Sequence, residues 1–293
     1  MQERFSITPS SPFDFRATAY SHGWVALAPN TWKEEPAAVH RVERLNSGQV
    51  VLLQITGTGS NAQPELAIEV THAGGLSATE RKEIVNTVGH MFRIGEDLSP
   101  FYALCQEKGG LWTRLTGGLG RLLRSPTLFE DVVKTICTTN IQWGGTVRMV
   151  AELVNSFGEP YAGDASRRAF PVPEAMAAET LDSFKASVRL GYRGAYVHTL
   201  ARQIASGELD LEALRDADIS TPELKKELLA IKGVGNYAAA TLLMLIGRYD
   251  ELAIDTEFRA FVAKKYFGGS YSSDQEAQAI YADWGRWKYL AYW

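Results

Sequence analysis

One acidic residue near the end of the chain stands out as a group that could do chemistry. Asp255 closes the short apolar run that begins at Leu252, and a helical pattern follows it through Arg259. An ionised carboxylate in such a place can stabilise a developing positive charge on a sugar or orient a water molecule for attack. Capping of the next helix is the alternative role, and for a single Asp it is the more frequent one.

A tight turn lies shortly before this acid. Lys232-Gly233-Val234-Gly235 separates a helical pattern over Thr221–Ile231 from a strongly apolar helix that begins near Tyr237. Glycine at both positions allows positive φ and the close approach of another backbone. The N–H groups that open the second helix suit a phosphate, and such a contact ignores base sequence. An ordinary turn between core helices is the alternative, whereas the missing third glycine disfavours a dinucleotide-binding fingerprint.

The first hundred or so residues read as a small sheet with a covering helix. The β-rich runs Val39–Leu45 and Gln49–Thr56 are joined by a plausible hairpin turn, Asn46-Ser47-Gly48, and Leu66–Thr71 reads as another strand. The capping-box sequence Ser77-Ala78-Thr79-Glu80 predicts a helix that ends at about Phe92.

From Leu111 onward the pattern is helical. Ser125-Pro126 predicts a helix start with an N-cap followed by proline. Further helices are expected over residues 147–157, 193–205 and 221–231. The expected fold class is therefore α+β, with a mixed α/β N-terminal domain at residues 1–110 and an all-helical domain at residues 111–293.

Composition excludes several classes of protein. The 30 basic and 34 acidic residues give a net charge of −4, which argues against a broadly basic nucleic-acid coat. Two cysteines, Cys105 and Cys137, cannot build a four-cysteine zinc or iron–sulfur site, and the five histidines show no metal spacing. Because neither a signal peptide nor a membrane-spanning stretch is apparent, we expect an intracellular protein, either cytoplasmic or in the nucleoid or nucleus.

The segment Leu229–Arg259 resembles the helix-hairpin-helix DNA glycosylase superfamily. Gly233-Val234-Gly235 matches the hairpin of that family, and Asp255 matches its acidic residue. Leu190–Tyr196 is similar to a segment typical of the 8-oxoguanine branch, and Ile136–Gln142 resembles the loop that carries the DNA wedge. The resemblance covers residues 110–293, and the N-terminal region matches by layout alone. It implies a hydrolase of base excision repair that acts on double-stranded DNA containing a damaged base, with Asp255 as the catalytic residue.

The resemblance implies roles for further residues. The DNA wedge falls on Asn140, with Ile141 or Gln142 next, and the DNA backbone would contact Lys232, Gly233, Val234, Gly235 and Arg259. It implies chemistry without a metal or organic cofactor, although a monovalent cation can sit at the hairpin carbonyl oxygens. We expect a monomer that does not associate with membranes.

Position 237 separates the branches of this family. Bifunctional members carry a lysine two positions after the second hairpin glycine, where it forms a Schiff base with the sugar. Tyr237 stands there in this sequence and cannot form that intermediate, whereas the 3-methyladenine enzymes are similar in carrying an aromatic residue. With Trp287 and Trp293, it is predicted to line a base pocket. Cation–π attraction of ~0.5–2 kcal/mol would favour a positively charged alkylated purine there.

The favoured hypothesis is therefore a monofunctional glycosylase for alkylated purines. An 8-oxoguanine-type glycosylase, with or without lyase activity, stays open because the Leu190–Tyr196 segment leans toward that branch. A non-catalytic DNA-binding protein that kept the hairpin also stays open, although it would have no need of Asp255. A helical enzyme for small molecules is disfavoured because no phosphate-loop or cofactor fingerprint is present. For the C-terminal aromatic residues, core packing is as good an interpretation as a pocket.

Overall fold

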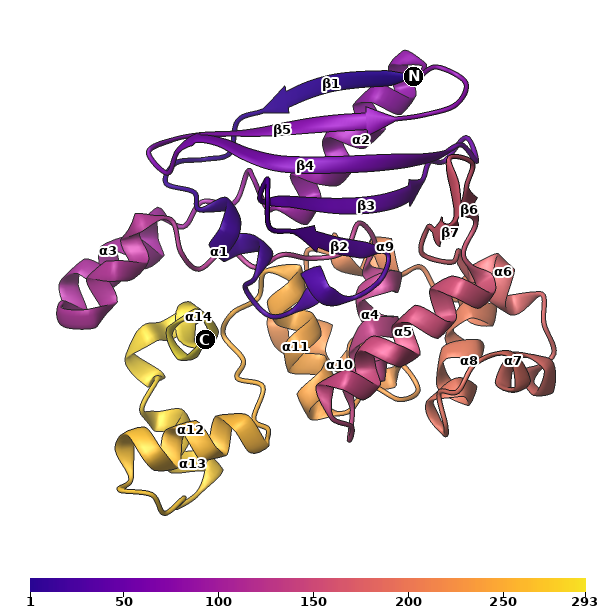
Figure 1. Cartoon of the computed structure of the whole chain (residues 1–293). Coiled ribbons are helices and arrows are strands. Elements are labelled where there is room, and N and C mark those ends of the chain that lie inside the picture. Colours follow the sequence, from indigo (N-terminus) through magenta and orange to yellow (C-terminus); the bar gives the residue numbers. More distant parts are fainter. The chain divides into compact units, whose positions relative to one another are not determined.

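The computed structural model describes all 293 residues and divides into two compact units, Met1–Leu209 and Asp210–Trp293 (Figure 1). No helix in it is both long and apolar enough to cross a bilayer. The elements of the first unit are β1 (Gln2–Ile7), α1 (Phe15–Ala19), η1 (Trp24–Ala26), β2 (Asn30–Lys33), β3 (Ala38–Arg44), β4 (Val50–Ser60), β5 (Gln63–Thr71), α2 (Ala78–Met91), α3 (Ser99–Lys108), η2 (Gly110–Gly117), α4 (Leu128–Thr138), α5 (Trp143–Phe157), β6 (Pro160–Tyr161), β7 (Asp164–Arg168), α6 (Pro173–Ala177), α7 (Leu181–Ser187) and α8 (Arg193–Ala205).

The second unit is entirely helical. Its elements are α9 (Leu211–Arg215), α10 (Thr221–Ala230), α11 (Asn236–Ile246), α12 (Thr256–Tyr266), α13 (Asp274–Ala279), η3 (Ala282–Trp287) and α14 (Lys288–Tyr292). The predicted α+β fold class is confirmed. The predicted boundary near residue 110 lies after the five-stranded sheet, whereas contacts divide the chain after Leu209. Within the region predicted to be all-helical, β6 and β7 form a short two-stranded sheet. The domain boundary near residue 110 therefore stays a prediction.

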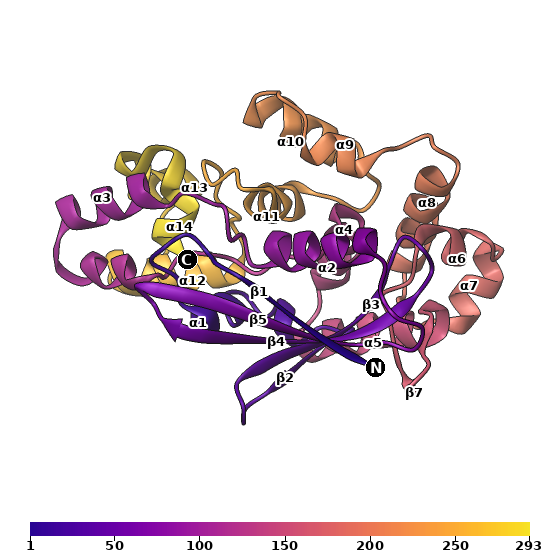
Figure 2. The same cartoon turned by 90° about the horizontal axis from the view of Figure 1, so that it is seen from above.

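The N-terminal sheet is antiparallel, with strand order β1-β5-β4-β3-β2. Residues alternate along β4, so that its inward side chains, such as Leu53 and Ile55, are fully buried. Helix α2 lies along one face of the sheet (Figures 1 and 2) and buries Ile84 and Val88. The predicted turn at residues 46–48 is confirmed, because the Leu45 N–H donates to the Gln49 carbonyl across it at 2.8 Å.

The start of α2 follows the sequence prediction closely. The Ser77 hydroxyl accepts a hydrogen bond from the Glu80 N–H at 3.2 Å, and the Glu80 carboxylate accepts one from the Ser77 N–H at 2.7 Å. The reciprocal pair satisfies two N–H groups that the helix cannot satisfy itself. The predicted capping box is therefore confirmed, with the helix ending at Met91.

Helix α4 begins two residues later than the sequence predicted. Its N-cap is Thr127, whose hydroxyl accepts from the Glu130 N–H at 3.2 Å, so the predicted cap at Ser125 is wrong. The reason is that tertiary contacts already engage Ser125. The Ser125 N–H donates to Asp131 Oδ1 at 3.0 Å, and Lys134 Nζ donates to the Ser125 hydroxyl at 3.3 Å. These contacts keep Ser125 in the segment that precedes α4.

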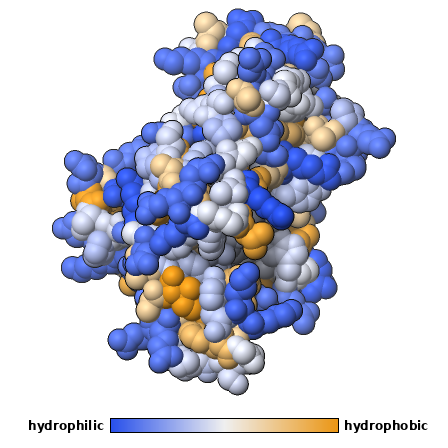
Figure 3. Space-filling model, turned by 90° about the vertical axis from the view of Figure 1, so that its left-hand side faces the viewer, coloured by the Kyte–Doolittle hydropathy of each residue, from blue (hydrophilic) through white to orange (hydrophobic).

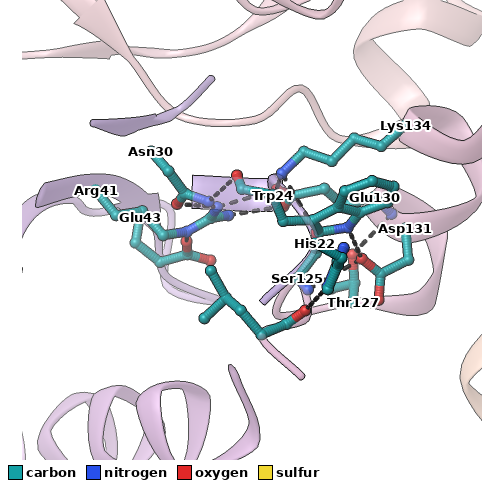
Figure 4. Close-up of polar contacts among 11 residues, drawn as sticks. His22, Trp24, Asn30, Arg41, Glu43, Ser125, Thr127, Glu130, Asp131 and Lys134 are labelled. Atoms are coloured by element: carbon teal, nitrogen blue, oxygen red, sulfur yellow. Dashed lines mark hydrogen bonds and ion pairs between the residues drawn. The ribbon is translucent and has the colours of Figure 1, made fainter. Parts of the chain in front are cut away.

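A buried charge cluster joins the sheet to α4 (Figure 4). The Arg41 guanidinium, on β3, donates two hydrogen bonds to the Glu130 carboxylate, at 3.0 and 2.7 Å. Lys134 Nζ reaches the same carboxylate at 2.7 Å, and all three side chains are at most 2% exposed. Such charges tolerate burial only when they are paired. The cluster therefore fixes α4, whose far end leads into the predicted wedge loop.

The helical hairpin of the second unit consists of α10 and α11. Ser220 opens α10 with a capping box to Glu223, and Thr221, Leu224 and Leu228 form its buried face. Helix α11 is buried from Ala238 to Leu245, which its alanine- and leucine-rich sequence permits. The predicted pair of helices joined by a short glycine-containing turn is confirmed.

Candidate active site

The hairpin turn uses its two glycines differently. Gly233 has φ +95°, in the left-handed region, while the Val234 N–H donates back to the Ile231 carbonyl at 3.0 Å. Gly235 is extended (φ −96°, ψ −175°), so it does not use the positive φ that glycine allows. The fold requires glycine at the first position. At the second, a Cβ atom would meet nothing within 4 Å, so the protein itself leaves the space open.

The turn also presents the start of α11. Gly235 is the N-cap of α11 and has no side chain with which to cap it, so the first N–H groups of the helix have no capping side chain. Val234 is only 6% exposed, so that its side chain belongs to the core and only its main chain can meet a ligand. Lys232 is exposed beside it. The turn therefore offers main-chain donors next to one positive charge, an arrangement that suits a phosphate.

Asp255 is the N-cap of α12. Its Oδ1 accepts a hydrogen bond from the Phe258 N–H at 2.7 Å, so the helix-capping role that the sequence offered is present. Its other oxygen accepts no hydrogen bond, and the half-buried side chain forms no ion pair. One carboxylate oxygen is therefore engaged in holding the helix, while the second is left to act on something else.

Two tyrosines of α14, Tyr289 and Tyr292, lie near this carboxylate, and the sequence analysis did not single them out. Burial raises the pKa of Tyr289 well above its usual value, and the fields of Tyr237, Tyr292 and Asp255 raise it further. Burial, then Asp255, also raises the pKa of Tyr292. Electrostatic coupling of this kind needs proximity, so Tyr237, Asp255, Tyr289 and Tyr292 form one group. The raised pKa values keep the phenols of Tyr289 and Tyr292 neutral near the carboxylate.

The predicted pocket residues fall in different environments. Tyr237 is half-buried in the first turn of α11. Trp293 is 54% exposed and stacks against Tyr289 with ring centroids 6.1 Å apart. Trp287 is 7% exposed and stacks on Tyr249 at 5.8 Å. The structure therefore brings Tyr237 and Trp293 to the tyrosine group, whereas Trp287 packs in the core beside Tyr249.

Few large apolar side chains of the second unit are exposed, so the exposed ones help to locate a binding surface. Hydrophilic residues predominate on the face in Figure 3, where apolar residues form small separate groups. In the second unit the large apolar side chains that remain exposed are Leu229, Phe261, Tyr266 and Trp293. Only Trp293 among them contacts both Tyr289 and Tyr292, so it is the accessible ring of the group.

Arg259 has an acidic partner of its own. Its guanidinium donates two hydrogen bonds to Asp274, both at 3.0 Å, and the Tyr271 hydroxyl donates to the same carboxylate at 2.7 Å. Asp274 raises the pKa of Arg259 further. The arginine is thus held by a bidentate pair, and a role on DNA would need part of that pairing to be shared.

The predicted wedge loop, in the first unit, is exposed. Asn140 adopts φ +49°, a left-handed conformation that asparagine tolerates better than most residues. Ile141 is 39% exposed, and Gly145 makes room for it, since a Cβ there would lie 2.4 Å from its Cδ1 atom. Gln142 is the exposed N-cap residue of α5. An exposed Ile and a tightly turned Asn are suited to enter a base stack.

The segment Leu190–Tyr196 contacts this loop rather than only packing the core. The Asn140 amide donates to the Tyr192 hydroxyl at 3.4 Å, and the Arg193 guanidinium lies 4.4 Å over the Tyr192 ring and donates to the Thr139 carbonyl. Tyr192 is 52% exposed, and Trp143, on the other side of the loop, is 44% exposed. Sequence reasoning missed both rings, because only their exposure marks them.

No three His, Cys, Asp or Glu side chains gather closely enough to hold a metal ion. The turn at residues 231–235 offers main-chain carbonyl oxygens and no acidic side chain. Such a donor set would suit a monovalent cation better than a divalent one, and the cation that the resemblance implies stays a prediction.

The site lies in an arrangement in which an antiparallel sheet comes ahead of a helical hairpin in the sequence, with an Asp at the start of the helix that follows the hairpin. No family model matches the chain. In sequence it is 29% identical over 176 residues to the DNA-3-methyladenine glycosylase of Bacillus subtilis (strain 168). That match covers 58% of this chain and 56% of the relative, so it spans little more than half the relative's length.

Solved structures share the fold over almost the whole chain. The 3-methyladenine DNA glycosylase from Archaeoglobus fulgidus matches with a TM-score of 0.76 and 18% identity, over 98% of this chain and 96% of that one. The 8-oxoguanine glycosylase/lyase of Clostridium acetobutylicum, solved with double-stranded DNA, matches with a TM-score of 0.70 and 17% identity, over 100% and 96%. The resemblance predicted from the sequence is therefore confirmed.

Proposed function

We propose that this protein is a monofunctional DNA glycosylase of base excision repair, which hydrolyses the N-glycosidic bond of an alkylated purine in duplex DNA. The observation that carries the proposal is Asp255, a half-buried carboxylate without a cationic partner, set among tyrosines one helix after a phosphate-binding type of turn. The name of the Bacillus subtilis relative supports the same activity. We expect the protein to act as a monomer.

The contact of the hairpin with the DNA backbone does not depend on base sequence. Main-chain N–H groups at Gly235 and Tyr237 bind a backbone phosphate, with Lys232 adding charge and Gly233 shaping the turn. A monovalent cation at the hairpin carbonyls would strengthen this contact by adding positive charge. Two structural neighbours were solved with DNA, one of them with double-stranded DNA, which supports duplex DNA as the partner. Because main-chain groups do the binding, a net charge of −4 is no obstacle.

The damaged nucleotide must leave the stack before the bond can break. Asn140 or Ile141 fills the space left in the duplex, with Gln142 as a further candidate. Flipping costs a few kcal/mol, and less for a base that is damaged or mispaired. The exposed loop and its contact with Tyr192 support this role.

Asp255 acts on the sugar. As the glycosidic bond stretches, positive charge develops on the ring, and the carboxylate oxygen that does not cap α12 stabilises it or orients the attacking water. An alkylated purine is already a good leaving group, so that strong acid catalysis on the base is unnecessary. The rings of Tyr237 and Trp293 stack on the base, and cation–π attraction favours a positively charged one. The products are the free base and an abasic site.

The runner-up is a glycosylase of the 8-oxoguanine type. The contact of Tyr192 and Arg193 with the wedge loop favours it, because the segment that resembles this branch lies where DNA would be read. Tyr237 disfavours its lyase activity, because a phenol cannot form the Schiff base that strand cleavage requires.

A panel of duplexes with single lesions tests the proposal. The lesions are 3-methyladenine, 7-methylguanine, hypoxanthine, 8-oxoguanine and uracil, each followed by alkaline cleavage on a gel. We expect excision of the two methylated purines and no adduct on borohydride trapping. Excision of 8-oxoguanine alone would favour the runner-up, a trapped adduct would contradict the monofunctional mechanism, and binding without excision would indicate a non-catalytic protein.

A further inference from the structure

We propose that Trp143, the first residue of α5, is a further DNA-binding residue, whose indole ring stacks on a nucleotide of the distorted duplex beside the wedge loop. The inference rests on the proposed function for the distortion of that duplex. It goes beyond that function because it gives residues 22–24, near the N-terminus, the role of holding the ring.

Exposed apolar side chains of the first unit are concentrated at the wedge loop. Ile141 and Trp143 are both exposed, and so is Tyr192, whose hydroxyl accepts a hydrogen bond from the Asn140 amide. The other large apolar side chains exposed in this unit are spread over the N-terminus, the end of α1, η2 and α7. A group of exposed apolar side chains on a mostly polar surface marks an interaction site.

The indole of Trp143 has no polar partner within the protein. Its ring is 44% exposed, and its N–H donates no hydrogen bond to another residue. By contrast, Trp24 Nε1 donates to Asp131 at 2.7 Å, and Trp32 Nε1 donates to a glutamate at 2.6 Å. Tryptophan combines a large apolar ring with one donor, and both are usually engaged when the ring packs inside a protein. Trp143 keeps the donor and part of the ring for a ligand.

Gly23 supports the inner side of this ring. A Cβ atom at Gly23 would lie 2.8 Å from Cζ2 and 3.0 Å from Cη2 of Trp143, so the six-membered ring of the indole packs directly on the glycine. Gly23 also adopts φ +94°, in the left-handed region. Both features require glycine. A ring that is already held in place loses little conformational freedom when it binds.

The turn at Gly23 is itself anchored to the helix that leads into the wedge loop. Trp24 is 3% exposed, and its hydrogen bond to Asp131 joins the turn to α4 (Figure 4). On the other side of the turn, His22 Nε2 contacts the Leu123 carbonyl. The support of the indole ring and the wedge loop are therefore fixed by the same helix.

The surface next to the ring is open. Gly144 and Gly145 follow Trp143 in the first turn of α5, although glycine is the weakest helix former apart from proline. Gly145 makes room for the Ile141 side chain, whereas a Cβ atom at Gly144 would meet nothing within 4 Å. Packing within the protein therefore gives no reason for glycine at position 144. The missing side chain lets a DNA strand approach the helix closely.

A nucleotide of distorted DNA fits this surface. When a base leaves the stack, its neighbours lose a stacking partner, and a flat aromatic ring can take its place. Trp143 directly follows the predicted wedge residues, so its ring would enter beside the group that fills the gap. Because the ring carries no charge, its contribution should not depend on salt as a phosphate contact does.

The first experiment measures the Kd for an abasic duplex at several salt concentrations. Trp143→Ala removes the stacking ring and should raise the Kd about tenfold, whereas Trp143→Phe should stay within about threefold of wild type. The dependence of log Kd on log salt should be the same for all three proteins. An unchanged Kd in Trp143→Ala, or a reduced salt dependence, would overturn the proposal.

Tyr20→Ala is the matched control for the loss of an exposed ring. Tyr20 belongs to the same unit and is 48% exposed, but its ring packs on Trp32, with centroids 4.9 Å apart. Its replacement should leave the Kd unchanged. An equal rise in Tyr20→Ala and Trp143→Ala would contradict a specific role for Trp143.

The second experiment displaces the ring without removing it. Gly23→Ala places a methyl group against Trp143 and should raise the Kd for the abasic duplex severalfold. Gly75→Ala controls for backbone strain, because Gly75 has φ +83° and a Cβ atom there would meet nothing within 4 Å. Urea unfolding checks that both variants fold. Equal Kd values for the two variants would contradict the supporting role of Gly23.

These measurements separate the inference from the proposed function. If wild type binds the abasic duplex but excises no lesion, the proposed function fails, and the Kd of Trp143→Ala still decides the inference. If lesions are excised and Trp143→Ala binds as tightly as wild type, only the inference fails.

Discussion

Two carboxylates, one in each unit, show how the same chemical group is used in opposite ways. Glu130 of the first unit is 2% exposed and accepts charge-assisted contacts from Arg41 and Lys134. Asp255 of the second unit is half-buried and accepts one hydrogen bond, from a main-chain N–H. Both carboxylate oxygens of Glu130 accept hydrogen bonds from the protein, whereas one oxygen of Asp255 has no partner.

The difference separates a structural acid from a reactive one. Burial alone would raise the pKa of Glu130, but Arg41 and Lys134 outweigh it and lower the pKa to about 2. Because the oxygens of Glu130 are already paired, this carboxylate cannot stabilise an additional positive charge in a transition state. Asp255 forms no ion pair and lies near the phenols of Tyr289 and Tyr292, so in the proposed reaction a positive sugar would be the group that compensates its charge. Missing pairing, rather than burial, is therefore the feature that marks the candidate catalytic residue.

The largest expected effect is that of Asp255→Asn. Asn can still accept from the Phe258 N–H, so the cap should survive, while loss of the charge should lower excision by at least about 100-fold. Binding to duplex DNA should persist. Single-turnover excision and a gel shift measure the two properties.

Asp210→Asn is the matched control for this change. Asp210 caps α9 in the same unit by accepting from the Ala213 N–H at 2.9 Å. Its replacement should leave excision unchanged. If both variants lost activity equally, capping rather than chemistry would explain the role of Asp255.

Structural features that depend on a few neighbouring residues were predictable from the sequence. The Ser77–Glu80 capping box, the turn at residues 46–48 and the helical hairpin each depend on a few adjacent positions, and all three are present. The failure at Ser125 had a different cause. Its N–H binds Asp131, and the helix begins at Leu128 instead, after Thr127, whose spacing from Glu130 is itself typical of a helix start.

The candidate site was predictable only in part, for the same reason. Asp255 and the hairpin lie within one segment, so that spacing reveals them. The pairing of Arg259 with Asp274, and the stacking of Trp287 on Tyr249, depend on how distant residues fold together. Among the C-terminal aromatic residues, only the structure distinguishes the buried Trp287 from Tyr292, which lies beside the carboxylate.

The second prediction concerns the structural acid. Arg41→Met leaves Glu130 buried with one cation fewer, and we expect a loss of about 3 kcal/mol in the free energy of unfolding. Excision per folded molecule should not change. Arg44→Met, on the same strand, removes an exposed pair with Glu159 and should cost less than about 1 kcal/mol. Urea unfolding compares them, and equal losses would contradict the importance of burial.

The third prediction is a pH dependence of the buried region. Removal from water lowers the pKa of His22, close to this cluster, to about 4, well below the value of about 6.5 expected in the unfolded chain. Between these values the unfolded chain binds the proton and the folded protein does not. Stability is therefore full above pH 6.5 and falls as the pH drops toward 4. His22→Gln should flatten that part of the stability curve in urea unfolding, and an unchanged slope would contradict the assignment.

The smallest expected change in stability, and a direct probe of the DNA grip, is Gly235→Ala. Its backbone is extended and a Cβ would meet nothing within 4 Å, so the free energy of unfolding should shift by only a few tenths of a kcal/mol. Gly233→Ala, at φ +95°, should cost about 1 kcal/mol because alanine is strained there. If a phosphate approaches Gly235, the added methyl group should weaken binding to every duplex severalfold, with or without a lesion. Undiminished binding by Gly235→Ala would mean that the open space at this turn is not where the backbone lies.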